Sequence, residues 1–210
     1  MLFSKRNLTA ILSQLKSFEK PSAELEQYAT PPEIAVDWIW HMAQSGEVAG
    51  KVILDAACGP GILGLGLLLL GAKKVYFLDK DEKIIRICRE NYELLKKEYE
   101  IGAAEFVLQD ITLLDAESTG ITVVVQNPPF GTKIEHADKK FLEKAFAVAP
   151  LVYSMHKWST QKFVEAVAKD FGFEITSVWK YEFRLPATQS FHKKPVEVVD
   201  VGLWKMERKK

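Results

Sequence analysis

The most chemically specific part of this sequence is the tetrapeptide Asn127-Pro128-Pro129-Phe130, which follows the β-branched run Ile121–Val125. An exocyclic amine on an aromatic base is a poor nucleophile, because its lone pair is delocalised into the ring. Two acceptors aimed at its N–H bonds would restore nucleophilicity, and the Asn127 side-chain oxygen and the Pro128 carbonyl can supply them. Proline stiffens such a turn by fixing φ, and Phe130 offers a face for an extruded base. We therefore predict that this tetrapeptide, called the acceptor turn below, is catalytic; the alternative is a proline-rich turn beside a buried Phe.

A second candidate site is the glycine loop, Asp55-Ala56-Ala57-Cys58-Gly59-Pro60-Gly61, which lies between a strand-like run and a helix-like run. Ligands of open α/β sheets bind outside the carboxyl ends of the strands, and glycine lets the backbone approach them closely. The loop lacks a G-x-G-x-x-G fingerprint in register, and Asp55 precedes its glycines. An acid there would repel a pyrophosphate but suits a ligand with a positive end, such as the amino group of S-adenosylmethionine. The alternative is an ordinary strand-to-helix turn.

Two further acids end the next two predicted strands. Asp79 stands where an acid binds ribose hydroxyls in dinucleotide folds, and Asp110, followed by Ile111, can accept a hydrogen bond from an adenine amino group. A single Asp after a strand is usually a turn residue or a helix cap, and we assign the cap role to Asp81. Acids at three consecutive strand ends favour S-adenosylmethionine, whose activated methyl group needs mainly positioning. We expect no metal, because the histidines share no ligand spacing.

The elements that must position these residues alternate between short apolar runs and longer amphipathic runs. This alternation predicts an α/β fold with a parallel sheet and helices on both faces. Two late strand-like runs with no helix between them predict an antiparallel hairpin around the Pro186–Pro195 loop. By analogy, this is a Rossmann-like class I methyltransferase with a mixed seven-stranded sheet. The predicted strands are Val52–Leu54, Val75–Leu78, Glu105–Leu108, Ile121–Val125, Leu151–Ser154, Phe173–Leu185 and Val196–Met206, and the helices between them are a run ending at Leu70, Lys83–Glu98, Asp138–Val148 and Lys157–Phe171.

Length and composition predict one such domain preceded by an extension. The chain has 210 residues and is 48% hydrophobic, which is enough for one sizeable core. We expect residues 1–50 to be a helical extension, with helices at Asn7–Leu15 and Glu33–Met42, that contributes to the cofactor or substrate site, and residues 51–210 to be the methyltransferase domain. The formal net charge is zero, so the protein as a whole has no positive electrostatic field that would attract nucleic acid. Two cysteines and no signal-like or membrane-length apolar run predict a cytoplasmic protein.

The sequence resembles the amino-group methyltransferases of nucleic acid, because it has a glycine loop, acidic strand ends and an acceptor turn in the same order. The similarity is closer to the small archaeal and eukaryotic methyltransferase-like proteins that make N6-methyladenosine in small-subunit ribosomal RNA, and it extends from about Leu25 to Val201. The resemblance implies S-adenosylmethionine as cofactor and an adenine of structured RNA as substrate. The segments that carry it are Leu25-Glu26-Gln27-Tyr28-Ala29-Thr30-Pro31, Asn127-Pro128-Pro129-Phe130-Gly131-Thr132-Lys133, Val152-Tyr153-Ser154-Met155-His156-Lys157, and Leu185-Pro186-Ala187 with Phe191-His192-Lys193-Lys194.

The resemblance also assigns roles within the extension and points to a partner. It implies that Gln27, Tyr28 and Thr30 close over the methionine end of the cofactor. The sequence departs from the family at Ala57, where the family usually has glycine, and the added methyl reduces the room beside the cofactor. Eukaryotic relatives work with a small zinc-binding activator protein, which is therefore a candidate partner.

RNA contacts are predicted near the acceptor turn. Lys193 and Lys194 lie beside Phe191 and His192 in the loop of the predicted hairpin, a pattern that suits phosphate contacts and base stacking. The alternative is a solvated loop. Lys133 follows the acceptor turn and extends this face, and we expect His156, after the fifth strand, to line the substrate mouth.

Three other functions are compatible with parts of this pattern. A protein glutamine methyltransferase acting on a translation factor would use the same acceptor turn, but Phe130 in place of Tyr and the basic loop argue against it. Guanine-N2 RNA and adenine-N6 DNA methyltransferases share the tetrapeptide. A module that only binds RNA or the ribosome is opposed by the intact acids and Asn127.

Overall fold

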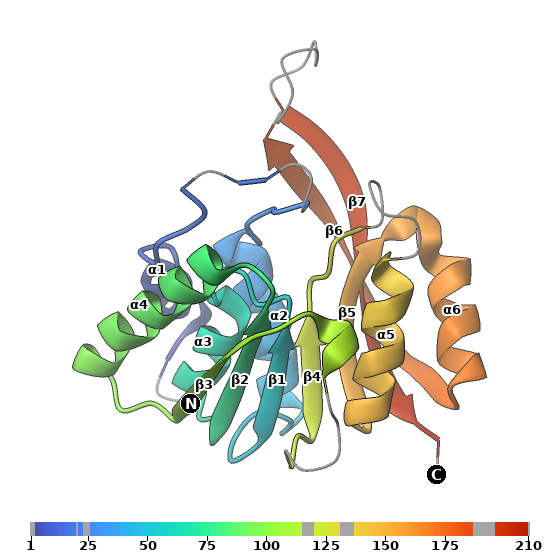
Figure 1. Ribbon diagram of the computed structural model, residues 1–210, viewed down its shortest axis with the longest axis horizontal. Coiled ribbons are helices and arrows are strands. Elements are labelled where there is room, and N and C mark those ends of the chain that lie inside the picture. Colours follow the sequence, from blue (N-terminus) through green and yellow to red (C-terminus); the bar gives the residue numbers. More distant parts are fainter. Residues whose placement is uncertain are drawn as a thin grey trace.

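The computed structural model describes residues 3–19, 21–22, 26–114, 120–130, 137–186 and 196–209. These residues form one seven-stranded sheet in the order β3-β2-β1-β4-β5-β7-β6 (Figure 1). The first five strands are parallel, and β7 runs antiparallel between β5 and β6. The predicted mixed sheet with a terminal hairpin is therefore confirmed. The strands are β1 Val52–Ala56, β2 Lys74–Asp79, β3 Ala103–Leu108, β4 Val123–Gln126, β5 Leu151–Lys157, β6 Phe173–Pro186 and β7 Val196–Arg208.

Helices cover both faces of the sheet, as predicted. Successive residues of a strand point to opposite faces, and apolar residues on both faces need to be covered. Ile53 of β1 packs in the core under the first four helices, and its neighbour Leu54 packs in a second core under the last two. Each face thus buries its own apolar cluster. The helices are α1 Lys5–Leu12, α2 Pro32–Gln44, α3 Ile62–Leu69, α4 Glu82–Glu98, α5 Ala137–Val148 and α6 Gln161–Asp170. None of the described helices is both long enough and apolar enough to cross a bilayer.

The predicted boundaries after the fifth strand were wrong. β5 continues to Lys157, and a 3-10 turn, Trp158–Thr160, separates it from α6. The extra residues are extended because they join the antiparallel ladder with β7, where His156 is paired with Gly202 and Lys157 with Val201. A ladder made with a strand so distant in sequence has no local signal in the Leu151–Lys157 segment.

The hairpin of β6 and β7 extends beyond the rest of the sheet. Pairing with β5 ends at Val201, whereas the two hairpin strands remain paired to Pro186 and Val196. The free end projects at the edge where the parallel strands have their carboxyl ends (Figure 1). The hairpin therefore extends the molecule on the side where ligands of such sheets bind.

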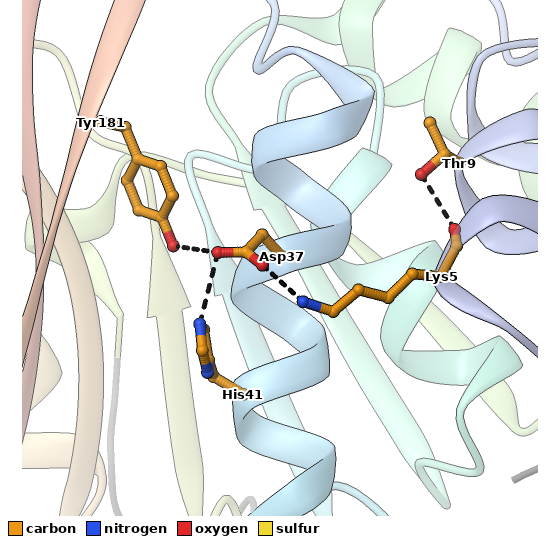
Figure 2. Close-up of polar contacts among 5 residues, drawn as sticks. All are labelled: Lys5, Thr9, Asp37, His41 and Tyr181. Carbon is orange, nitrogen blue, oxygen red and sulfur yellow. Dashed lines mark hydrogen bonds and ion pairs between the residues drawn. The ribbon is translucent and has the colours of Figure 1, made fainter.

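A polar cluster on α2 attaches the N-terminal helices to this hairpin (Figure 2). The Asp37 carboxylate accepts hydrogen bonds from Lys5 Nζ at 2.6 Å and from the Tyr181 hydroxyl at 2.8 Å, and His41 Nε2 lies 3.3 Å from it. Burial alone would raise the pKa of Asp37, but the hydrogen bonds from Lys5 and Tyr181 outweigh it, so this pKa lies below its usual value. Asp37 thereby joins α1, α2 and β6.

Candidate functional site

A cavity of about 410 Å³ opens at the carboxyl ends of β1 to β4. This volume falls within the roughly 300–1,000 Å³ usual for small-molecule sites. Its floor comes from residues that follow these strands, and its outer wall from residues 12–18 and 26–32 of the N-terminal extension. Among the predicted site residues, those lining it are Gln27, Tyr28, Thr30, Ala57, Gly59, Asp79, Asp110, Ile111, Asn127 and Pro129.

The glycine loop turns sharply beneath this cavity. Ala57 has φ of 56°, a left-handed conformation that costs an L-residue with a Cβ about 1–2 kcal/mol. Glycine would adopt this conformation without that cost. At Gly61, φ is 93° and an added Cβ would lie 2.5 Å from the sulfur of Cys88. The loop is therefore held in one conformation against α4.

Asp55 does not line the cavity. It lies within β1, which continues to Ala56, and it is 1% exposed. One carboxylate oxygen accepts a hydrogen bond from the backbone N–H of Gly64 at 2.8 Å. Burial, reinforced by the charge of Asp79, raises the pKa of Asp55 to about 7. The structure thus places Asp55 under the glycine loop, where it holds the start of α3, instead of facing a ligand.

Asp79 faces the cavity from the end of β2. Its two oxygens accept hydrogen bonds from the backbone N–H groups of Gly59 at 3.1 Å and Asp81 at 3.0 Å. Burial raises the pKa of Asp79, although those two bonds favour its charged form. Asp81 is the helix cap that we predicted, because it accepts from the N–H of Lys83 at 2.9 Å. Its other oxygen accepts from Gln27 Nε2 at 2.9 Å, which ties the extension to this edge.

Asp110 and Ile111 form the wall beyond β3. One oxygen of Asp110 accepts from both the N–H and the hydroxyl of Thr112, at 2.9 and 2.7 Å. These two bonds lower the pKa of Asp110, so the group is a carboxylate at neutral pH. Ile111 is 4% exposed and offers the cavity an apolar surface. An acceptor beside an apolar wall suits the edge and face of a purine.

The acceptor turn presents one unused acceptor. Asn127 Nδ2 donates to Thr30 Oγ1 at 3.0 Å, which orients the amide. Its Oδ1 is buried and has no hydrogen-bond partner among the described residues. Leaving a buried carbonyl oxygen without a partner costs about 1–3 kcal/mol. An N–H donor brought into the cavity would satisfy it.

The other residues of the acceptor turn differ in their access to the cavity. Pro129 lines it, whereas Pro128 and Phe130 do not. Phe130 is 8% exposed and packs between Tyr28, at 6.5 Å between ring centroids, and Phe183, at 6.4 Å. A base that stacks on Phe130 must therefore displace a neighbouring side chain.

The RNA contacts predicted from the sequence are not assembled by the described residues. His156 lies inside β5 and is 1% exposed, because α5 and β7 cover it, so the prediction that it lines the substrate mouth was wrong. The remaining predicted contacts lie outside the described residues: Lys133, Phe191, His192, Lys193 and Lys194.

Sequence reasoning missed Asn91, which connects the extension to the glycine loop. It is 1% exposed; its Oδ1 accepts from Lys16 N at 2.9 Å, and its Nδ2 donates to the carbonyls of Lys16 at 2.9 Å and Pro60 at 3.0 Å. The bonds hold the segment that brings Lys16 and Phe18 to the cavity wall. A signal was present, since Asn91 is a polar residue in the apolar stripe of α4 that contains Cys88 and Leu95.

Comparison with known proteins agrees with this geometry. Residues 36–169 match the family model described as conserved hypothetical protein 95. The rRNA N(6)-adenosine-methyltransferase Mettl5 of Drosophila melanogaster is 33% identical over 96% of this chain and 95% of its own length. The crystal structure of the proposed RNA methyltransferase PH1948 from Pyrococcus horikoshii is 32% identical, covers 99% of both chains and superposes with a TM-score of 0.87. Magnesium protoporphyrin IX methyltransferase from Synechocystis, with bound SAM, shares the fold at 16% identity, a TM-score of 0.64, and coverage of 83% of this chain and 78% of its own.

Proposed function

The chain belongs to the family of METTL5-type rRNA N6-adenosine-methyltransferases, and from that premise we propose that it methylates the N6 amino group of an adenine in small-subunit ribosomal RNA. The observation that carries this proposal is the buried Asn127 Oδ1, which has no hydrogen-bond partner among the described residues and is oriented by Thr30. A neutral acceptor at this point suits an amine that must lose conjugation with its ring before it reacts.

The residues of the cavity fit S-adenosylmethionine. When bound, this cofactor supplies an activated methyl group on a sulfonium. We assign the ribose hydroxyls to the Asp79 carboxylate and the adenine edge to Asp110 beside Ile111, both of which face the cavity. The backbone of Ala57 and Gly59 forms the floor, and Gln27, Tyr28 and Thr30 form the outer wall at the methionine end. In this proposal residues 1–50 are part of the site, and residues 51–210 are the methyltransferase domain.

The residues of this chain act by positioning the target amine. Asn127 Oδ1 and the Pro128 carbonyl oxygen accept hydrogen bonds from the two N–H groups of the target amine. These hydrogen bonds localise the lone pair on the amine nitrogen. Pro129 keeps the turn stiff, and Phe130 supports the base after a neighbouring ring moves aside. With the cofactor bound, the nitrogen would gain the methyl group as the methyl–sulfur bond breaks, which leaves a neutral thioether, and the nitrogen would release one proton to solvent. Correct alignment of nucleophile and methyl group supplies most of the rate enhancement.

Ribosomal RNA is the substrate class that the relatives' names support. The β6–β7 hairpin projects at the edge where the parallel strands end (Figure 1), which is the edge at which the cavity opens. We include Lys133, Phe191, His192, Lys193 and Lys194 as candidate RNA contacts, a small zinc-binding activator as a candidate partner, and the cytoplasm as the location. The need for an activator is tested by assaying the chain purified alone.

The decisive experiment incubates the protein with radiolabelled S-adenosylmethionine and ribosomal RNA from a source that lacks adenine-N6 modification. We expect label that nuclease releases as N6-methyladenosine, identified by nucleoside mass spectrometry. The Asn127→Ala variant should lose transfer while it still binds the cofactor in a calorimetric titration. Label in guanine, in DNA or in protease-sensitive material, with none in RNA adenine, would refute the proposal.

A further inference from the structure

Behind the acceptor turn, four buried polar side chains lie in a chain of contacts. Hydrogen bonds link the first three, and a contact too long for a hydrogen bond links the last two. Gln126 Nε2 donates to Ser154 Oγ at 3.0 Å, Ser154 Oγ lies 2.7 Å from His156 Nε2, and His156 Nδ1 lies 3.8 Å from Asp138 Oδ2. Gln126 and Ser154 are fully buried, His156 is 1% exposed and Asp138 is 7% exposed. None of them lines the cavity.

The direction of each contact in this chain is determined by its members. Burial lowers the pKa of His156, although Asp138 opposes this effect, so the ring is neutral and carries one proton. We place that proton on Nδ1, the nitrogen nearer the Asp138 carboxylate, where it makes no hydrogen bond to the described residues. Nε2 is then an acceptor for the Ser154 hydroxyl, whose oxygen accepts from Gln126. The Gln126 amide, the Ser154 hydroxyl and the His156 Nδ1–H group therefore all point along the chain in the direction of Asp138.

The order Ser154, His156, Asp138 is that of a hydrolase triad, but it cannot act as one. Ser154 has no exposed surface and is walled off from the cavity, so no substrate carbonyl can reach its oxygen. A purely packing role is also a poor explanation, because apolar side chains would fill the same space without the cost of burying polar groups. The chain of contacts is better explained by the two segments that its ends connect.

Its ends lie on the two sides of the acceptor turn. Gln126 is the last residue of β4 and directly precedes Asn127 in the sequence, whereas Asp138 lies in the first turn of α5. Ser154 and His156 stand on β5, the strand that pairs with β4. The chain thus connects the strand that enters the turn with the helix that follows it.

We propose that Ser154 and His156 are positioning residues for methyl transfer, which hold Gln126 and the start of α5 so that Asn127 presents its oxygen to the target amine. The inference rests on the proposed function, and it concerns the rate of transfer and not the binding of the cofactor. Loss of one member leaves a buried donor or acceptor without a partner and lets the β4 end relax.

The test compares Ser154→Ala with Tyr153→Phe in the transfer assay. Tyr153 is the adjacent residue on the opposite face of β5, and its hydroxyl bonds Glu47, so this control removes a hydrogen bond from the same strand away from the turn. We expect Ser154→Ala to lower kcat about tenfold or more while the Kd for S-adenosylmethionine changes less than about twofold. Tyr153→Phe should keep the kcat of the wild type.

Three outcomes would overturn the inference while an active wild type leaves the proposed function intact. They are a kcat of Ser154→Ala equal to that of the wild type, an equal loss of kcat in Tyr153→Phe, and a loss of cofactor affinity in proportion to kcat. If Ser154→Ala does not fold, Asp138→Asn replaces it, because this nearly isosteric change weakens the chain at its far end. An unchanged kcat in Asp138→Asn would then contradict the role. An inactive wild type would instead refute the proposed function.

Discussion

The side chain of Asn127 is held by that of Thr30, with 3.0 Å between Nδ2 and Oγ1, although the two residues are 97 positions apart. The bond joins the acceptor turn after β4 to the segment that leads into α2. The oxygen of the amide stays buried and without a hydrogen-bond partner among the described residues, in a residue that lines the cavity. The N-terminal segment therefore orients the Asn127 amide of the acceptor turn.

Replacing Thr30 by Val should uncouple this orientation. Without the hydroxyl, the Asn127 amide can rotate, and kcat for methyl transfer is expected to fall about tenfold. The matched control is Thr122→Val, which removes an exposed hydroxyl bond to the Val52 carbonyl at the opposite end of the sheet. Steady-state kinetics should show no change in the control. A wild-type kcat in Thr30→Val would mean that the amide is oriented by other contacts.

Replacing Asn91 by Ala should weaken cofactor binding and stability together. The change leaves backbone groups of Lys16 and Pro60 without their buried partner, which costs about 1–3 kcal/mol in the free energy of unfolding. It also releases the segment that forms one wall of the cavity, so the Kd for S-adenosylmethionine should rise by calorimetry. Leu95→Ala, one turn further along the same face of α4, should lose about 2–5 kcal/mol with an unchanged Kd. Equal Kd changes in both variants would argue against a specific role of Asn91 in holding the cavity wall.

Replacing Ala57 by Gly should stabilise the protein. The left-handed backbone at φ 56° costs alanine about 1–2 kcal/mol, while glycine loses about 0.5–1 kcal/mol through the greater freedom of the unfolded chain. The net gain in the free energy of unfolding is about 0–1.5 kcal/mol, measured by chemical denaturation. Ala56→Gly, the preceding residue in the last position of β1, should destabilise instead. Destabilisation by both substitutions would show that the strain at Ala57 is compensated locally.

The stability contributed by Asp37 should be lost in acid. Its pKa in the folded protein lies below the usual 3.8, so the unfolded chain takes up the proton first as the pH falls. The contribution is complete above about pH 4 and disappears as the pH falls through the lower folded pKa. Denaturant titrations of the wild type and Asp37→Asn should therefore differ at pH 6 and converge as the pH falls below 3.8 and through the lower folded pKa. A difference that is constant over this range would contradict the ion-pair explanation of the Asp37 cluster.

Much of this protein could be predicted from its sequence, because the signals concerned are local. A strand-like run followed by an acid predicted Asp79 and Asp110, which line the cavity. Two consecutive prolines after a β-branched run marked the acceptor turn, and Asp81 was recognisable as a cap from its place before α4. In a parallel sheet, the carboxyl ends of the strands meet at one edge, so these residues had to converge. The alternation of strands and helices likewise determined the layers of the fold.

Other features were decided only by the tertiary structure, because they depend on partners distant in the chain. The ladder with β7 drew His156 into β5 and buried it, and the same packing placed it beside Ser154 and Asp138. Asn91 and Lys16 are separated by 75 positions, and neither residue's neighbours indicate the other. Asp55 followed the local rule for a strand-end acid, yet its burial beneath the glycine loop turned it toward Gly64. Sequence patterns specify which residues can do chemistry at the sheet edge, whereas burial and long-range hydrogen bonding decide which of them line the cavity.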